Sequence, residues 1–199
     1  MLGIDPGVSR CGYGCVDRRG AALEVVCAGV ITTDPGERLE RRLAELASEL
    51  RGLMSELAPD LVAVERVLFQ VNARTAMSVG QAAGLTLVAA AEAGLVVSTY
   101  SANEVKQAVT GWGGAGKAEV QRMVAVLLDL PAPPRPPDAA DALALAICHA
   151  QIGPAQQRVQ AAKQSAEAVA SGAGPSHAPR GAAPVAARPG TARSEGTRR

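Results

Sequence analysis

Four acidic residues stand where apolar segments of this 199-residue chain end or begin: Asp5, Glu65, Asp138 and Asp141. Carboxylate oxygens are hard ligands, and several of them in one place suit Mg²⁺ or Mn²⁺ better than zinc. Two such ions about 3.5–4 Å apart can activate a water molecule and stabilise the leaving oxygen when a phosphodiester is cleaved. If the four side chains converge in the fold, we expect a two-metal phosphoryl-transfer site.

The first two acids end apolar runs that are expected to be buried strands. Asp5 ends the run that begins at Leu2 and is followed by a Pro-Gly pair, and Glu65 ends the run that begins at Leu61. If these two strands are neighbours, both carboxylates emerge at one sheet edge. Each also has a structural interpretation, because Asp5 could start an Asx-turn and Glu65 could pair with Arg66.

The other two acids open the last apolar segment. Asp138 and Asp141 lie three residues apart, and therefore on one face of a helix whose start is fixed by Pro136-Pro137. Asp138 could simply be the helix N-cap. Asp141 is harder to explain this way, because the helix around it must be buried and a buried carboxylate needs a metal or a cationic partner.

Strands and helices alternate over residues 1–152, which predicts one α/β domain with a mixed five-stranded sheet flanked by helices. Apolar or β-rich runs predict strands at Leu2–Asp5, Gly12–Asp17, Leu23–Thr32, Asp60–Glu65 and Leu95–Tyr100. The first three should form an antiparallel meander. Helices are expected at Glu37–Leu57, Ala73–Ala93, Ala102–Thr110, Lys117–Leu128 and Asp138–Ile152.

Residues 153–199 are rich in Ala, Pro, Gly and Arg, and we expect a disordered tail with at most a fluctuating helix over 155–170. Residues 151–199 hold seven Lys/Arg and two Asp/Glu, whereas residues 1–150 hold 13 and 17. The charge balance alone favours an acidic-surfaced enzyme, so a nucleic-acid hypothesis must rest on local placement. The tail could touch nucleic acid through Arg180, Arg188, Arg193, Arg198 and Arg199.

The chain shows no signal peptide and no apolar run long enough to span a membrane, so a soluble cytoplasmic protein is expected. Its four cysteines lack zinc spacing and are predicted to be reduced, buried thiols: Cys11, Cys15, Cys27 and Cys148.

Five segments follow one another in a particular order and spacing over about residues 1–150: Leu2-Gly3-Ile4-Asp5-Pro6-Gly7, Val64-Glu65-Arg66-Val67, Gly80-Gln81-Ala82-Ala83-Gly84, Val105-Lys106-Gln107-Ala108-Val109-Thr110-Gly111, and Asp138-Ala139-Ala140-Asp141-Ala142-Leu143-Ala144. In these segments the chain resembles the RuvC family of Holliday-junction resolvases, which share the ribonuclease-H-like fold. Each segment alone is a weak signal, but the ordered set is specific.

The resemblance implies a homodimer that binds a four-way DNA junction and nicks two opposed strands symmetrically, leaving 5′-phosphate ends. It implies that two Mg²⁺ ions, replaceable by Mn²⁺, are held by the family's catalytic acids, which fall on Asp5, Glu65, Asp138 and Asp141. It also suggests that a branch-migration helicase complex of the RuvA and RuvB type hands over the junction.

The resemblance further assigns DNA contacts. Lys106 and Lys117 match positions that the family uses near its active site, and Lys117 follows a glycine-rich run at a helix start. Phe69 or Leu68 is expected to wedge against bases at the crossover, where the family often has an aromatic residue. Other candidates for phosphate contact are Arg10 and Arg74.

Two further features have competing interpretations. Gly80 and Gly84 share one helix face, which predicts close packing either against the sheet or across the family's dimer interface. His149 could approach the metal site, but we favour a structural histidine near the helix C-terminus, where a cation is stabilised.

Three other functions compete with the nuclease. Gly3-Ile4-Asp5-Pro6-Gly7 before a meander also resembles the phosphate-binding hairpin of actin-like ATPases and sugar kinases, although those enzymes need two such lobes. A non-catalytic junction-binding module and a resolvase-like nuclease acting on RNA are the others.

Overall fold

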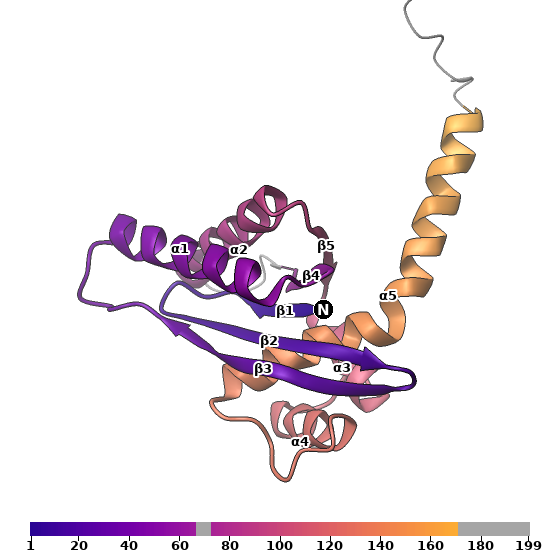
Figure 1. Cartoon of the computed structure of the whole chain (residues 1–199), viewed down its shortest axis with the longest axis horizontal. Coiled ribbons are helices and arrows are strands. Elements are labelled where there is room, and N and C mark those ends of the chain that lie inside the picture. The colour runs from indigo at the N-terminus through magenta and orange to yellow at the C-terminus, as the bar shows by residue number, and fades with distance from the viewer. Residues whose placement is uncertain (67–72, 171–199) are drawn as a thin grey trace, which may run out of the picture. The chain divides into compact units, whose positions relative to one another are not determined.

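The computed structural model describes residues 1–66 and 73–170, and every statement below about what the structure contains refers to these residues. Along the chain it consists of strands β1 (Leu2–Asp5), β2 (Arg10–Arg19) and β3 (Ala22–Thr32), helix α1 (Leu39–Leu57), strand β4 (Leu61–Glu65), helix α2 (Ala73–Glu92), strand β5 (Val96–Tyr100), and helices α3 (Ala102–Thr110), α4 (Lys117–Leu127) and α5 (Pro137–Ala170) (Figure 1). Within this part of the chain, no helix is both long and apolar enough to cross a bilayer.

The five strands form one mixed sheet in the order β3-β2-β1-β4-β5. The first three are antiparallel neighbours, as tight turns require, whereas β4 and β5 join β1 in parallel through helical connections. The predicted meander and mixed five-stranded sheet are both confirmed.

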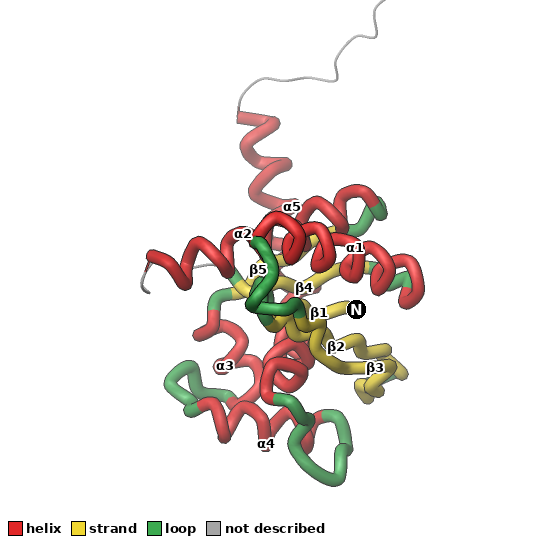
Figure 2. Tube along the Cα trace, turned by 90° about the vertical axis from the view of Figure 1, so that its left-hand side faces the viewer, coloured by secondary structure: helices red, strands yellow, loops and turns green. Residues whose placement is uncertain are grey.

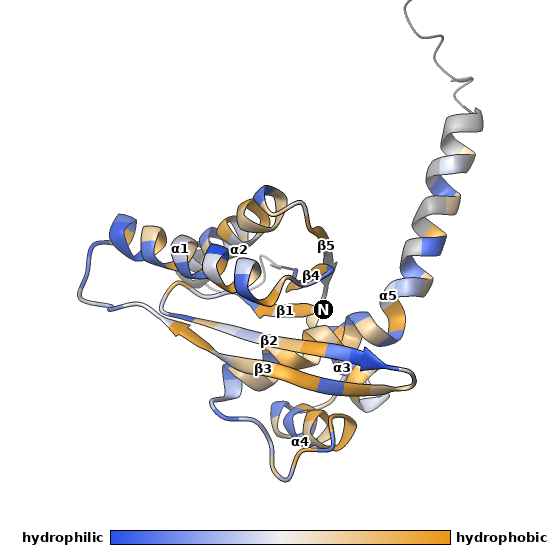
Figure 3. Ribbon diagram, viewed as in Figure 1, coloured by the Kyte–Doolittle hydropathy of each residue, from blue (hydrophilic) through white to orange (hydrophobic). Residues whose placement is uncertain are grey.

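Helices cover both faces of the sheet, and Figure 2 shows α1 and α2 on one side with α3 and α4 on the other. The alternation of side chains along β1 explains the two layers. Leu2 and Ile4 are fully buried in the core that includes α1 and α2, whereas Gly3 faces the first part of α5. Figure 3 shows β1 as apolar and α1 as a mixture of hydrophilic and apolar residues, as expected for a covering helix.

Close contact between the sheet and α5 depends on glycines in the central strands. A Cβ atom at Gly3 would overlap the backbone carbonyl of Ala142, and one at Gly12 would overlap the carbonyl of Asp138. Any larger residue at either position would push α5 outwards. The close approach of the start of α5 to β1 and β2 therefore requires glycine, without a side chain, at these two positions.

Two helix boundaries differ by more than one residue from the sequence prediction. Helix α1 begins at Leu39 rather than Glu37, because Asp34 organises a turn in which its side chain accepts a hydrogen bond from the Gly36 N–H (2.8 Å) and its carbonyl accepts one from the Glu37 N–H (3.1 Å).

Helix α5 does not end at Ile152 but continues through Pro154 to Ala170. Proline lacks the N–H that would bond to the carbonyl four residues earlier, and that carbonyl, on Ala150, accepts a hydrogen bond from Arg18 of β2 instead. Met1–Gln160 forms one compact unit and Ala161–Arg199 a second, which the structure describes only as far as Ala170. The predicted tail after residue 152 stays a prediction.

Candidate active site

The sheet register places Asp5 and Glu65 side by side. Strands β1 and β4 are parallel neighbours in which Gly3 pairs with Ala63 and Ile4 with Val64, so the two acids are the next residues of the ladder. Both side chains point to the face covered by α3, α4 and α5, because they lie two residues after Gly3 and Ala63. The expectation that these strands are adjacent is confirmed.

A cleft of about 390 Å³ opens at this sheet edge. Three carboxylates line it: Asp5, Glu65 and Asp141, which begins the second turn of α5. Two lysines also line it, Lys106 of α3 and Lys117 at the first position of α4. Apolar residues complete the wall, among them Val105, Ala115, Val120 and Leu145. The fold thus gathers three of the four predicted acids and two predicted DNA-contact residues in one cleft.

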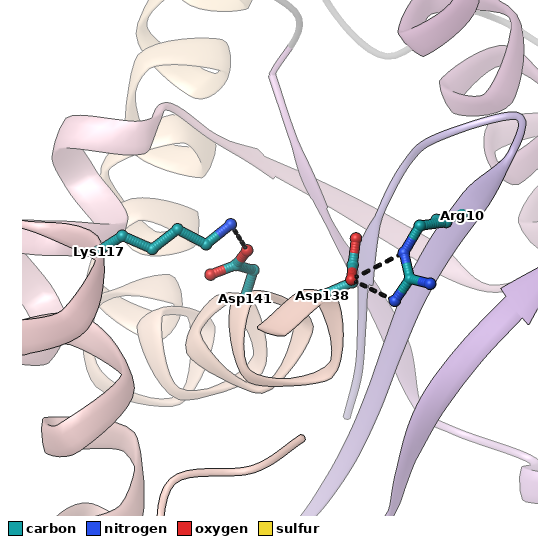
Figure 4. Close-up of polar contacts among 4 residues, drawn as sticks. All are labelled: Arg10, Lys117, Asp138 and Asp141. Carbon is teal, nitrogen blue, oxygen red and sulfur yellow. Dashed lines mark hydrogen bonds and ion pairs between the residues drawn. The ribbon is translucent and has the colours of Figure 1, made fainter. Parts of the chain in front are cut away.

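Two cations hold the acids of α5 on opposite sides of the helix start (Figure 4). The Lys117 Nζ lies 2.6 Å from Asp141 Oδ2, and the Arg10 guanidinium donates to Asp138 Oδ2 at 2.8 and 3.2 Å. Asp138 therefore lies at the margin of the cleft rather than in its lining. It is inside the first turn of α5, not at the N-cap.

Burial and like charges make the cleft costly to ionise fully. The pKa of Asp5 is raised from 3.8 to about 7, mainly by burial and further by the negative charges of Asp141 and Glu65, while the positive charge of Lys117 opposes the rise. Burial also raises the pKa of Glu65, with Asp141 adding to the effect. By contrast, the hydrogen bond from Arg10 lowers the pKa of Asp138. The cleft lacks positive charge relative to its carboxylates.

Divalent cations fit this donor set chemically. Hard carboxylate oxygens are the ligands that Mg²⁺ and Mn²⁺ prefer, and an added cation would relieve the repulsion that raises the pKa of Asp5. In the described residues no three His, Cys, Asp or Glu side chains form a ready-made metal-binding group. Asp138 and Asp141 are engaged by Arg10 and Lys117, so both would have to turn inwards to complete a shared site.

The remaining predicted DNA-contact residues differ in position. Arg10 is half-exposed, and its guanidinium contacts Asp138. Leu68 and Phe69 lie outside the described residues, as does the side chain of Arg74, so their predicted contacts stay predictions.

Two structural interpretations from the sequence can now be judged. His149 does not line the cleft; it is buried, and its Nδ1 lies 2.7 Å from the Tyr100 hydroxyl. It is structural, as favoured, but the reason offered was wrong, because α5 continues beyond it and burial lowers its pKa. Arg66 donates to the Thr99 carbonyl at 3.3 Å instead of pairing with Glu65.

The sequence interpretation missed the residues that position α5. Gly3 and Gly12 were not singled out for close packing, and Arg10 was not expected to hold Asp138. The available signal was that Gly12 and Gly14 alternate on β2 opposite Asp5 and Gly3 of β1, so that glycines gather on one sheet face.

Comparison with known proteins identifies relatives of this fold and site. The family model described as crossover junction endodeoxyribonuclease RuvC matches residues 1–149. The RuvC proteins of Salinispora arenicola and Chloroflexus aggregans are 50% and 49% identical to this chain over 167 and 157 residues; the matches cover 83% and 79% of this chain and 95% and 96% of those proteins. The family-model match spans the segments that carry Asp5, Glu65, Asp138 and Asp141.

Solved structures agree. The structure of Thermus thermophilus RuvC in complex with a Holliday junction substrate is 39% identical, with a TM-score of 0.72, and the match covers 77% of this chain and 94% of that one. The ribonuclease-H-like fold expected from the sequence is thereby confirmed. The family model and these relatives match nearly the whole compact unit. This chain therefore belongs to the RuvC family of crossover junction endodeoxyribonucleases.

Proposed function

We propose that this chain resolves four-way DNA junctions by hydrolysing one phosphodiester bond in each of two opposed strands, with the cleft at Asp5 as the catalytic centre. The single observation that carries this proposal is the meeting of Asp5, Glu65 and Asp141 with Lys106 and Lys117 in one cleft. Acids that bind a cation and bases that bind phosphate are the two requirements of metal-assisted phosphodiester hydrolysis.

Asp5, Glu65 and Asp141, joined by Asp138, would hold two Mg²⁺ ions, for which Mn²⁺ can substitute. When bound, the metal ions supply charge stabilisation at the scissile phosphate and an activated water, leaving a 5′-phosphate and a 3′-hydroxyl. The protein's own contribution is positioning. The ladder of β1 and β4 fixes Asp5 and Glu65, and the glycine contacts fix the helix that carries the other two acids.

Lys117 has two successive partners in this proposal. In the structure its ammonium neutralises Asp141. Once Asp141 binds a metal ion, the ammonium is free to contact a phosphate of the DNA strand at the mouth of the cleft, where its side chain is already 64% exposed. Lys106 of α3 lines the same cleft and is placed for a second phosphate contact.

A homodimer is supported by an unpartnered face of α2. Met77, Leu87 and Val88 are between 44% and 67% exposed, and a Cβ atom at Gly80 or Gly84 would meet nothing within 4 Å in the described residues. One sequence interpretation held that these glycines pack against the sheet, and within the described residues they do not. Spacings of three and four place all five on one face, which a second copy would cover. Two copies supply the two centres that symmetric nicking needs.

The dimer is tested by the molar mass in solution. Gly84→Glu should shift the protein from dimer to monomer in light-scattering chromatography, whereas Gly52→Glu, at a glycine of α1 that also faces open space, should not. A monomeric wild type would refute the dimer but not the nuclease.

The decisive experiment for the function is a nicking assay on a four-way junction and on a linear duplex of the same sequence. We expect paired nicks in the junction with Mg²⁺ or Mn²⁺, none with EDTA, and little cutting of the duplex. Junction binding without nicking in any metal would leave only a binding module. Nucleotide binding without junction cleavage would favour the actin-like ATPase, and preferred cutting of RNA would favour the third rival.

Two further proposals rest on fewer observations. The first is a cytoplasmic location, which suits the four free thiols because the cytoplasm is reducing. The handover of junctions by a helicase complex of the RuvA and RuvB type stays a prediction from the resemblance, and a pull-down with such a complex on junction DNA would test it.

A further inference from the structure

Trp112 is an exposed aromatic residue beside the catalytic cleft. It is the chain's single tryptophan, and its side chain is 63% exposed. Of the two tyrosines, Tyr100 is buried and Tyr13 is partly buried. Trp112 is thus the one strongly exposed aromatic side chain in the described part of the chain, although exposing an indole to water is unfavourable.

Hydrogen bonds from α3 hold the loop that carries Trp112. The Gln107 side chain donates to the Gly111 carbonyl (2.7 Å) and accepts from the Gly113 N–H (3.1 Å). The Thr110 hydroxyl oxygen accepts from the Trp112 N–H at 3.2 Å. The loop is therefore built to present its central residue in a fixed place.

The indole itself rests on the backbone of Gly114. A Cβ atom at position 114 would lie 2.6 Å from Cζ2 and 2.8 Å from Cε2 of Trp112, closer than real side chains approach. The ring is thus supported by the loop while most of its surface stays in solvent. A supported ring with an open surface is a stacking platform, and bases stack on such platforms in single-stranded nucleic-acid sites.

The position of the loop indicates which molecule stacks there. Ala115, Gly116 and Lys117, which follow the tryptophan, line the catalytic cleft. Lys106, whose carbonyl accepts a hydrogen bond from Thr110, lines it from α3. A strand whose phosphates lie between these lysines carries its bases past the indole. Charge and adjacency therefore favour nucleic acid over a protein partner.

We propose that Trp112 stacks on an unpaired nucleobase next to the scissile phosphate, making it a DNA-positioning residue of this chain. The proposal rests on the proposed junction-cleaving function. Stacking on Trp112 orients the strand in the cleft and makes cleavage depend on the presence of a base at one position near the cut.

The single tryptophan allows a direct optical test. The wild-type protein is titrated with a four-way junction in EDTA, so that binding is measured without cutting. We expect the Trp112 emission to be quenched as the junction binds, and the indole to become less accessible to acrylamide. Unchanged emission and accessibility in a fully bound complex would overturn the proposal, as would quenching that follows protein concentration without DNA, which would indicate contact with a second copy.

Substitutions provide the second test. Trp112→Ala should weaken junction binding about tenfold, within the range for loss of one stacked base, and Trp112→Phe should restore most of it. Val126→Ala, at a 69% exposed apolar residue of α4 that lines no cleft, is the matched control and should bind like wild type. Equal binding by Trp112→Ala and wild type would refute the inference.

A series of junctions with one abasic site each, placed around the scissile phosphate, identifies the base. At one position the missing base should weaken wild-type binding about tenfold and Trp112→Ala binding hardly at all, because the two changes remove the same contact. Additive losses at every position would contradict stacking. If wild type neither binds nor nicks the junction, the proposed function fails before Trp112 is tested; if it does both, only the inference is at stake.

Discussion

Asp141 and His149 lie two turns apart on the same buried stretch of α5, and their surroundings are opposite. His149 is enclosed, and the Tyr100 hydroxyl satisfies its Nδ1 from within the fold at 2.7 Å. Asp141 opens into a cleft with two other carboxylates and is neutralised by Lys117, a lysine whose side chain is mostly in solvent. One group is satisfied permanently, and the other is held by a partner that can leave.

This difference distinguishes a structural polar group from one that we propose is functional. Burial lowers the pKa of His149, which favours the neutral ring, and the Tyr100 hydroxyl is a hydrogen-bond partner for its Nδ1 inside the fold. Burial and like charge raise the pKa of Asp5 beside Asp141, so that cluster needs added positive charge. The uncompensated negative charge around Asp5 and Asp141 therefore marks this end of α5 as the candidate reactive end.

The largest effect is expected from Glu65→Gln, which keeps the size of the side chain but removes a carboxylate from the cleft. Nicking of a four-way junction should fall by roughly 10³-fold or more, since a ligand of the proposed metal site is lost, while junction binding in EDTA persists. Glu104→Gln is the control. Glu104 is the third helical residue of the α3 capping box with Ser101 and does not line the cleft, and Gln can take the same role, so this change should affect stability and activity little. Full nicking by Glu65→Gln would contradict the assignment.

Lys117→Met should have the next largest effect and should separate metal binding from catalysis. Removing the ammonium beside Asp141 makes the cleft more negative. The affinity for Mn²⁺, measured by calorimetry without DNA, should therefore rise, while nicking falls by about tenfold to a hundredfold because a phosphate contact is lost. Lys163→Met, at an exposed lysine far along α5, should change neither quantity. A lower Mn²⁺ affinity in Lys117→Met would show that the lysine supports the metal site instead of occupying it.

The third effect is on stability and depends on pH. Asp5 keeps its proton to about pH 7 in the folded chain but only to about pH 4 when unfolded, so the folded state binds more protons in that window. Stability should therefore fall as pH rises from about 4 to about 7, by at most a few kcal/mol at about 1.4 kcal/mol per pKa unit. Asp5→Asn should reduce this fall in denaturant titrations, leaving the smaller contribution of Glu65, whose pKa is also raised.

Mg²⁺ should reverse the same loss, since a ligand of the folded state stabilises it by roughly 2.7 kcal/mol at a hundred times its Kd. The rise in melting temperature should be greater at pH 8 than at pH 5, because protons compete for the carboxylates at the lower pH. An equal rise at both pH values, or one retained in Asp5→Asn, would place the bound cation elsewhere.

The smallest effect on function is expected from a change beside His149. Tyr100→Phe leaves His149 Nδ1 buried without its partner and should cost about 1–2 kcal/mol in urea unfolding, with nicking almost unchanged. Because folded His149 stays neutral while the unfolded ring takes up a proton near its usual pKa of 6.5, its contribution to stability should weaken as pH falls below that value. A large loss of nicking in Tyr100→Phe would break the distinction between the two ends of α5.

Periodicity was enough to predict most elements. The bounds of α3 were predicted without error, and those of β1, β4 and β5 to within a residue, because apolar runs bounded by turn residues are local signals. Helix α1 was predicted two residues too long, since the Asp34 turn competes with its first turn. The continuation of α5 through Pro154 depends on Arg18, more than a hundred residues away in the sequence, and no local pattern contains it.

The sequence by itself determined which residues are the candidates for the chemistry. The types and spacing of Asp5, Glu65, Asp138 and Asp141 predicted a divalent-metal site, and the ordered segments around them indicated the family. The tertiary structure decided how the acids differ. Asp5, Glu65 and Asp141 share the cleft, whereas Asp138 is drawn to its margin by Arg10. That division arises from contacts between segments distant in sequence, since the Gly3 and Gly12 backbones set how closely α5 approaches the sheet and the charges that meet there set each pKa.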